Sequence, residues 1–167
     1  MNVMAFAHYM TKRTLILCGG SYNRPYAQML KCALQDAHRL NKRGILVERA
    51  KEVVAIDARI EREKSVVRSI VSSAIDMGYA VSLYDGEEWA IKQSRSKDAL
   101  MAGIMSTDCD TLQFRKMFGD VKPVGSVFLV YGNSASEVMA DWSDNEEVNA
   151  ILKNAIAQCD RYSAKGW

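Results

Sequence analysis

The chain has 167 residues and a net charge of +2, and hydrophobic residues make up 49% of it and charged residues 25%. That length supports one domain with a sizeable core, and that composition excludes a chain that is disordered throughout. No stretch approaches the roughly 20 consecutive apolar residues of a transmembrane helix, so we expect no membrane contact. The first charges follow the apolar N-terminal residues rather than precede them, which argues against a secretory signal and predicts a cytoplasmic protein.

The charge is unevenly distributed along the chain. Residues 1–78 carry 13 Lys and Arg against 7 Asp and Glu, and residues 79–167 carry 9 against 13, which gives net charges of +6 and −4. A basic half can bind a polyanion such as nucleic acid. The alternatives are that the charges lie on solvated faces of helices, or that the two halves attract each other.

Cysteine and histidine usage indicates no metal site and no catalytic base. The two histidines, His8 and His38, and the four cysteines are scattered, whereas a zinc site needs about four ligands at close spacings. No G-x-S-x-G motif is present, and no set of residues suggests nucleophilic catalysis. We expect reduced thiols, no metal, no cofactor and no catalytic residues. The cysteines are Cys18, Cys32, Cys109 and Cys159.

Residues 1–44 are expected to contain a loose tail over residues 1–10, then a strand and a helix. Thr14–Cys18 reads TLILC, an apolar and partly β-branched run that predicts a short strand. Apolar residues then recur at helical spacing over Arg24–Lys42, which predicts an amphipathic helix that Gly44 ends.

The segment between Ile45 and Met77 contains no Pro or Gly and predicts one continuous helix of about 50 Å. A heptad that starts at Leu46 places apolar residues at eight of its ten a and d positions. The alternative is a break within the charged stretch Asp57–Lys64. A helix of this length exceeds the face of a small sheet, so the preceding helix or a second copy of the chain must cover the rest. The predicted interface residues are Leu46, Val53, Ile56, Ile60, Val67 and Ile70.

After Gly78 the spacing at which apolar residues recur changes from about 3.6 residues to 2 residues, which indicates strands. Two strands flank a turn at Asp85-Gly86, a third follows at Thr111–Arg115, and two more lie within residues 125–142. Ser96 is expected to cap a short helix, and Ser143 with Glu146 forms an S-x-x-E capping box before the last helix.

These elements predict an α+β fold. We expect an antiparallel sheet of about five strands with helices packed on one face, preceded by two N-terminal helices of which the second is long. Residues 1–44 and 45–167 are expected to form the two parts of one domain overall.

The stretch Gly19-Gly20-Ser21 lies between a predicted strand and a predicted helix, which is the order of a phosphate-binding loop. It matches neither the Walker loop nor the dinucleotide fingerprint. The order of elements alone makes four residues candidates for anion binding, and the favoured alternative is a plain turn. The candidates are Gly19, Gly20, Ser21 and Arg24.

Two charged surfaces are further candidates for binding. A basic patch on the first predicted helix consists of Lys31, Arg39, Lys42 and Arg43. An acidic rim at two predicted turns, near Trp89 and Trp142, consists of Asp85, Glu87, Glu88 and Asp144.

The stretches GYAVSLYDGEEWAIKQS, STDCDTLQFR and GSVFLVYGNSASEVMADWSDNEEVNAIL resemble small uncharacterised proteins of phages and mobile genetic elements. The similarity covers about Ile56 to Ala157, and it is a pattern of short strands and acidic turns without a catalytic signature. It implies a cytoplasmic accessory protein that binds host machinery, and it assigns no functional residue.

We therefore expect a non-enzymatic binding protein that acts on a macromolecular partner, a host protein, and that forms a homodimer through the long helix. The first alternative is a small-ligand or phosphate-binding enzyme that uses the Gly19-Gly20-Ser21 loop. The second alternative is a nucleic-acid-binding protein that uses its basic N-terminal half.

Overall fold

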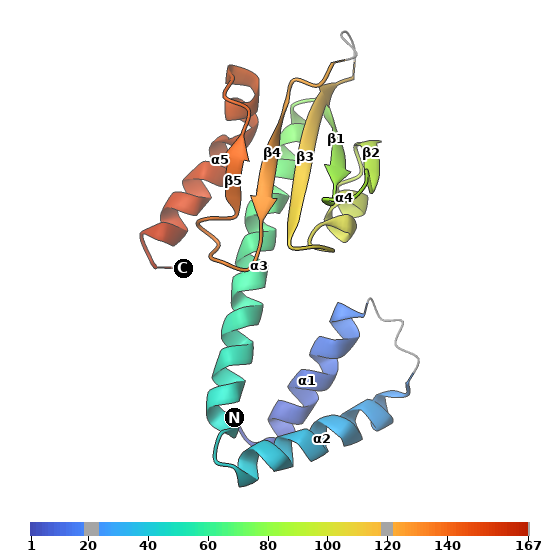
Figure 1. The fold of residues 1–167 in the computed structure, drawn as a ribbon, viewed down its shortest axis with the longest axis vertical. Coiled ribbons are helices and arrows are strands. Elements are labelled where there is room, and N and C mark those ends of the chain that lie inside the picture. The colour runs from blue at the N-terminus through green and yellow to red at the C-terminus, as the bar shows by residue number, and fades with distance from the viewer. Residues whose placement is uncertain (19–23, 118–121, 167) are drawn as a thin grey trace. The chain divides into compact units, whose positions relative to one another are not determined.

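The structure, a computed structural model, describes residues 1–18, 24–117 and 122–166 (Figure 1). The chain divides into two compact units, which we call the helical unit, Met1–Asp57, and the sheet unit, Ala58–Trp167. None of the helices in these ranges combines the length and the apolar composition needed to cross a membrane. The elements are α1 (Val3–Leu17), α2 (Tyr26–Lys42), α3 (Leu46–Asp76), β1 (Tyr79–Tyr84), β2 (Ile91–Ser94), α4 (Lys97–Gly103), β3 (Cys109–Lys116), β4 (Gly125–Val130), β5 (Met139–Trp142) and α5 (Glu146–Ser163).

The helical unit consists of α1, α2 and the first part of α3. Five apolar side chains from all three helices are buried together and form its core. The unit boundary falls inside α3, later than the predicted division after residue 44, because the first turns of α3 pack with α1 and α2. The core residues are Phe6, Ala7, Ala37, Leu46 and Ala50.

The start of the chain differs from the prediction, because one helix, α1, replaces the expected tail and the strand Thr14–Cys18. Asn2 caps this helix by accepting a hydrogen bond from the backbone N–H of Ala5 at 2.8 Å. Phe6, which is 4% exposed, lies one turn before Met10 and two turns before Thr14. Phe6 and Ala7 belong to the core and Met10 packs against it, whereas Thr14 is only partly buried, so the helix that this face starts continues through TLILC despite its strand propensity.

The two other helices of this part of the chain follow the prediction. Gly44 has a φ of 73°, a left-handed conformation suited to glycine, and it separates α2 from α3. The charged stretch Asp57–Lys64 does not interrupt α3, which runs for 31 residues. The single long helix is therefore confirmed.

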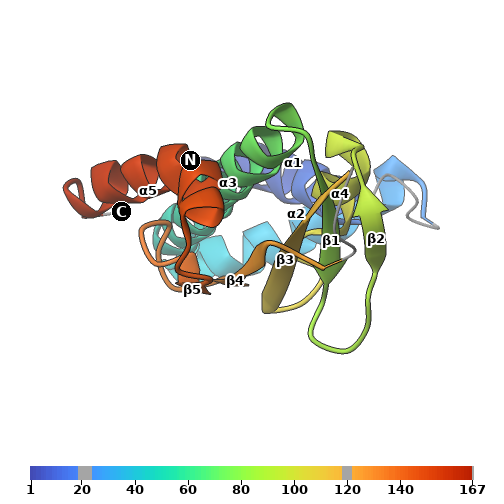
Figure 2. The same cartoon turned by 90° about the horizontal axis from the view of Figure 1, so that it is seen from above.

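The sheet unit contains a five-stranded antiparallel sheet in the order β2-β1-β3-β4-β5. The helices α4 and α5 and the C-terminal part of α3 lie on one face of this sheet (Figure 2). The α+β class and the five-stranded sheet are confirmed, although three helices rather than two precede the sheet.

Alternation along the strands decides which side chains enter this core. On β3, Leu112 and Phe114 are fully buried towards the helices, whereas Thr111 and Gln113 are partly exposed on the outer face. The inner face of the sheet and the helices on it bury 21 residues in one cluster.

The turn between β1 and β2 is wider than the predicted two-residue turn at Asp85-Gly86. The carboxylate of Asp85 accepts hydrogen bonds from the backbone N–H groups of Glu87 at 3.0 Å and Glu88 at 2.9 Å, which folds the connection into a longer loop. Trp89, which a two-residue turn would place on the second strand, consequently lies in this loop.

The predicted capping box of the last helix is wrong. The N-cap of α5 is Asn145, whose side chain accepts a hydrogen bond from the N–H of Val148 at 2.9 Å. The Ser143 hydroxyl accepts instead from the backbone N–H of Ser126 on β4 at 3.0 Å. The helix begins later because Ser143 still pairs with the neighbouring strand. The prediction that Ser96 caps α4 is confirmed.

Candidate functional site: a groove in the helical unit

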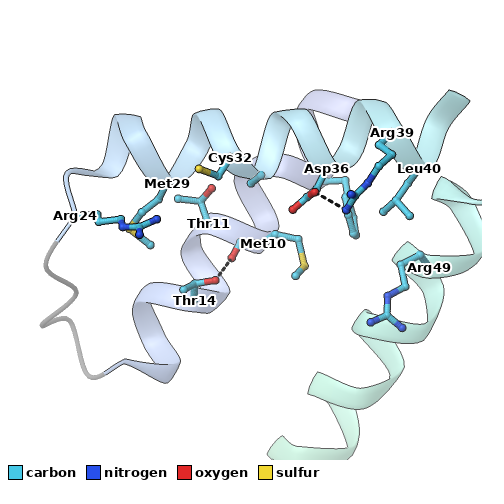
Figure 3. A pocket seen from close by; sticks show the side chains of 12 residues that line it. Met10, Thr11, Thr14, Arg24, Met29, Cys32, Asp36, Arg39, Leu40 and Arg49 are labelled. Atoms are coloured by element: carbon cyan, nitrogen blue, oxygen red, sulfur yellow. Dashed lines mark hydrogen bonds and ion pairs between the residues drawn. The ribbon is translucent and has the colours of Figure 1, made fainter.

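A groove of about 430 Å³ opens among α1, α2 and the start of α3 (Figure 3). That volume lies within the range of ligand sites, about 300–1,000 Å³. Apolar side chains form most of its lining. Met10 projects from α1, and Met29 and Leu40 project from opposite ends of α2 (Figure 3). Methionine side chains are flexible and polarisable, so they can repack around differently shaped apolar groups.

The polar part of the wall on α1 comes from two threonines. The hydroxyl of Thr11 donates to the carbonyl of Ala7 at 2.8 Å, and the hydroxyl of Thr14 donates to the carbonyl of Met10 at 2.9 Å. Each hydroxyl proton is thus already bonded within the helix, and the oxygen can still accept a hydrogen bond. Thr11 is 2% exposed, whereas Thr14 is partly exposed, so the Thr14 oxygen is the acceptor that this wall offers to the groove.

Three arginines mark the two ends of the groove (Figure 3). Arg24 lies at the end near Met29, and no other described residue forms an ion pair with it. At the other end, Arg39 pairs with Asp36 at 2.7 Å, and Arg49 pairs with Glu52 at 2.9 Å. Both pairs are more than half exposed, so they contribute little stability and can exchange for another carboxylate.

The structure brings together only some of the predicted anion-binding and basic residues. Gly19, Gly20 and Ser21 lie outside the described residues, whereas Arg24 is exposed and lines the groove. The predicted basic patch does not form one site, because Arg39 lines the groove, whereas Lys31 is exposed on α2 and is not among the described residues that line it. A shallow depression on α2 is lined by Gln35, His38, Arg39, Lys42 and Arg43.

The four residues of the predicted acidic rim do not meet. Asp85, Glu87 and Glu88 lie in the loop between β1 and β2 at one edge of the sheet, and Asp144 follows β5 at the opposite edge. The N–H groups of Glu88 and Glu87 hold the pKa of Asp85 below its ordinary value. The carboxylate of Asp144 accepts a hydrogen bond from the side chain of Asn149 at 3.3 Å.

The predicted interface residues on α3 are divided between the cores of the two units. Leu46 is buried in the helical unit, and Val67 and Ile70 are fully buried under the sheet. Val53 is buried too. Half-buried positions remain at Ile56 and Ile60.

A buried polar network in the sheet unit was missed by the sequence analysis. Glu63 is 1% exposed; its Oε1 accepts from the N–H of Gly132 at 3.1 Å and lies 3.6 Å from Nε of Arg59. Asp110 is also 1% exposed, and its Oδ2 accepts from the hydroxyl of Tyr131 at 2.8 Å. Burial, together with the nearby charge of Asp110, raises the pKa of Tyr131 strongly, so this hydroxyl keeps its proton.

Within residues 1–18, 24–117 and 122–166, no group of three or more His, Cys, Asp and Glu side chains is arranged to hold a metal ion. Comparisons of the chain with protein-family models, with curated proteins and with solved structures found no match. The resemblance to small phage proteins therefore stays a prediction, and the candidate sites are argued from the geometry of this chain.

Proposed function

We propose that this is a non-enzymatic binding protein whose groove in the helical unit holds an acidic, amphipathic segment of a partner protein. The observation that carries this proposal is the combination of an apolar, methionine-containing wall with arginines at both ends of one elongated groove. A host protein as the partner, a cytoplasmic location and a homodimer stay predictions.

The length of the groove favours a peptide segment over a compact small molecule. Met29 and Leu40 both line it and lie 11 residues apart on α2, which corresponds to about 16 Å along the helix axis. About three turns of a partner helix have the same length. Such a helix would place apolar residues, spaced three and four apart, against Met10 and Met29.

The charge of the helical unit favours an acidic segment. Met1–Asp57 carries nine Lys and Arg against four Asp and Glu, a net charge of +5. Acidic residues at both ends of a bound segment would meet Arg24 at one end and Arg39 with Arg49 at the other. Such complementary charges fix the direction of binding and accelerate the encounter.

The test uses the full chain and a labelled synthetic peptide of about four helical turns, with leucines on one face and glutamates elsewhere. Fluorescence anisotropy measures its affinity for the wild type, for Arg39→Glu and for Arg43→Glu. Arg43 is the matched control, since it lies next to the same helix but does not line the groove. We expect Arg39→Glu to weaken binding about tenfold or more, and Arg43→Glu to change it by less than about threefold.

Three results would overturn this proposal. The first is no binding of the peptide to the wild type. The second is equal binding of a peptide with the same composition but with its leucines scattered around the helix. The third is an equal loss of affinity in both variants, because a delocalised attraction for any polyanion, such as nucleic acid, would produce it. Circular dichroism checks that both variants remain folded.

A further inference from the structure

The outer face of the sheet carries a second hollow, separate from the groove and within the sheet unit. It has a volume of about 260 Å³, slightly below the usual range of ligand sites, so a bound ligand would extend over its rim. It is lined by side chains from β1, β2 and β3 and from the loop that carries Trp89. The lining residues are Ser82, Trp89, Lys92, Gln93, Gln113 and Arg115.

The strand register explains why this face is hollow. On β1 the outward residues Ala80 and Ser82 are small, and they are 2% and 5% exposed. Ser82 pairs with Gln113 on β3, and Ala80 pairs with Arg115. Long side chains on β3 therefore stand beside a floor of small ones.

A bulge on the other side completes the wall. Val81 pairs with Ser94, and Leu83 pairs with Ile91, so two residues of β2, Lys92 and Gln93, lie opposite the single residue Ser82. Bulges of this kind are frequent next to functional sites, because they redirect a side chain.

The backbone at this bulge is held in an unfavourable conformation. Gln93 has a φ of 48°, which is uncommon for a residue other than glycine, and its N–H donates to the hydroxyl of Ser82 at 2.9 Å. Residues kept in such conformations concentrate at binding and active sites, where the conformation places a side chain. Here it places Gln93 at the rim of the hollow.

The chemistry of the lining combines a ring, two cations and two amides. Trp89 is 39% exposed, and its ring packs against that of Tyr84 with a centroid separation of 5.3 Å, which leaves part of the indole open to a flat ligand. In the described part of the chain, Lys92 and Arg115 have no ion-pair partner, and Nε of Arg115 is buried without a hydrogen bond. Lys92 is exposed and Arg115 is partly exposed, so the ammonium and the terminal guanidinium nitrogens are the donors that can pair with an oxyanion.

We propose that this hollow binds a free mononucleotide, with its base on Trp89, its phosphate at Lys92 and Arg115, and the edge of the base at Gln93 and Gln113. Aromatic stacking, guanidinium–phosphate pairing and amide contacts to a base edge are the usual means of nucleotide recognition.

The local charge favours a free nucleotide over a nucleic-acid strand. The sheet unit has thirteen Lys and Arg against sixteen Asp and Glu, a net charge of −3, and Glu87 and Glu88 are exposed next to Trp89. A polyanion that extends beyond the hollow would meet these carboxylates, whereas a single phosphate inside it would not.

The experiment is isothermal titration of the full chain with adenosine, cytidine, guanosine and uridine 5′-monophosphates, each used separately as a probe. We expect at least one to bind at micromolar to millimolar concentration. Arg115→Gln and Lys92→Gln should each weaken that binding about tenfold. Lys92 is exposed, so its variant tests the site even if Arg115→Gln is unstable. Lys122→Gln, at an exposed lysine that does not line the hollow, is the control and should not change the affinity.

The proposal is overturned if none of the four probes binds, or if Lys92→Gln and Lys122→Gln bind the same probe equally. It is also overturned if a short single-stranded oligonucleotide binds while every mononucleotide fails, because the occupant would then be a nucleic acid. Binding of the same nucleotide with equal affinity by Trp89→Ala would contradict the stacking contact, and the proposal with it.

Discussion

Asp110 is a carboxylate in the hydrophobic core, on the inner face of β3. Its Oδ2 accepts from the N–H of Met105 at 2.9 Å and from the hydroxyl of Tyr131 at 2.8 Å, whereas Oδ1 has no partner among the described residues. Burial raises the pKa of Asp110, and these two hydrogen bonds oppose that rise only in part. The charged form is therefore disfavoured in the folded protein.

This geometry predicts how Asp110→Asn changes stability with pH. Because the folded pKa is raised above the unfolded one, the folded state holds the proton more tightly. The contribution of Asp110 to the free energy of unfolding is full at pH values below its pKa in the unfolded chain. It is lost as the pH rises through its pKa in the folded protein. Asparagine keeps an acceptor for Tyr131 and Met105 without the charge. We expect Asp110→Asn to have a higher free energy of unfolding than the wild type at neutral pH, and the difference to shrink towards about pH 4. Urea denaturation at both pH values measures this, and a less stable variant at neutral pH would contradict it.

The sequence contained a signal for both buried carboxylates, but not for their partners. Asp110 lies two and four residues before the buried Leu112 and Phe114, so period-2 alternation places it on the inner face. Glu63 occupies a d position of the predicted heptad among apolar residues. One partner of each carboxylate is distant: the Tyr131 hydroxyl lies about 20 residues from Asp110, and the Gly132 N–H lies about 70 residues from Glu63, where no local pattern reaches.

At the scale of the element, Asn145 starts α5 and also attaches it to the sheet. Its side-chain oxygen accepts from the N–H of Val148, and its Nδ2 donates to the carbonyl of Val124 at 3.0 Å. We expect Asn145→Ala to lower the free energy of unfolding by about 1–2 kcal/mol, measured by urea denaturation. Asn154→Ala, an exposed position inside the same helix, is the control and should be neutral or slightly stabilising. Equal effects of the two substitutions would show that Asn145 does not act as a cap.

Element types were predictable where the apolar pattern is long, and less so where it is short. Apolar residues recur at helical spacing over the 31 residues of α3, and apolar and polar residues alternate along the strands. Both kinds of element were therefore predicted from the sequence. Thr14–Cys18 has only five residues, too few to separate a strand from the last turn and a half of a helix. The helical spacing of Phe6, Ala7 and Thr11, together with Asn2 as a cap, would have identified the helix.

At the scale of the whole molecule, the two units differ in the size of their cores. Among the described residues, the core of the sheet unit has 21 buried members, whereas that of the helical unit has five. Since buried apolar surface supplies most of the stability, we expect the amides of α2 to exchange with deuterium about tenfold faster than those of α5, a helix of similar length. Hydrogen-exchange mass spectrometry of the full chain measures this. Protection of α2 equal to that of α5 would contradict it.

Which surfaces meet could not be read from the sequence. The apolar face of α3 was predicted, but its partners were not, since Leu46 packs with α1 and α2 while Val67 packs under the sheet. The groove depends on α1, which the sequence analysis divided into a tail and a strand. The outer hollow depends on one extra residue in β2, which only the register shows.

The groove is the proposed place where a partner segment binds, and the comparison of Arg39→Glu with Arg43→Glu tests this proposal most directly. Both changes reverse one charge at the same end of α2, but only Arg39 lines the groove. We predict that the acidic amphipathic peptide loses about tenfold in affinity, or about 1.4 kcal/mol, for Arg39→Glu alone. An equal loss for both variants, or no binding to the wild type, would contradict the account.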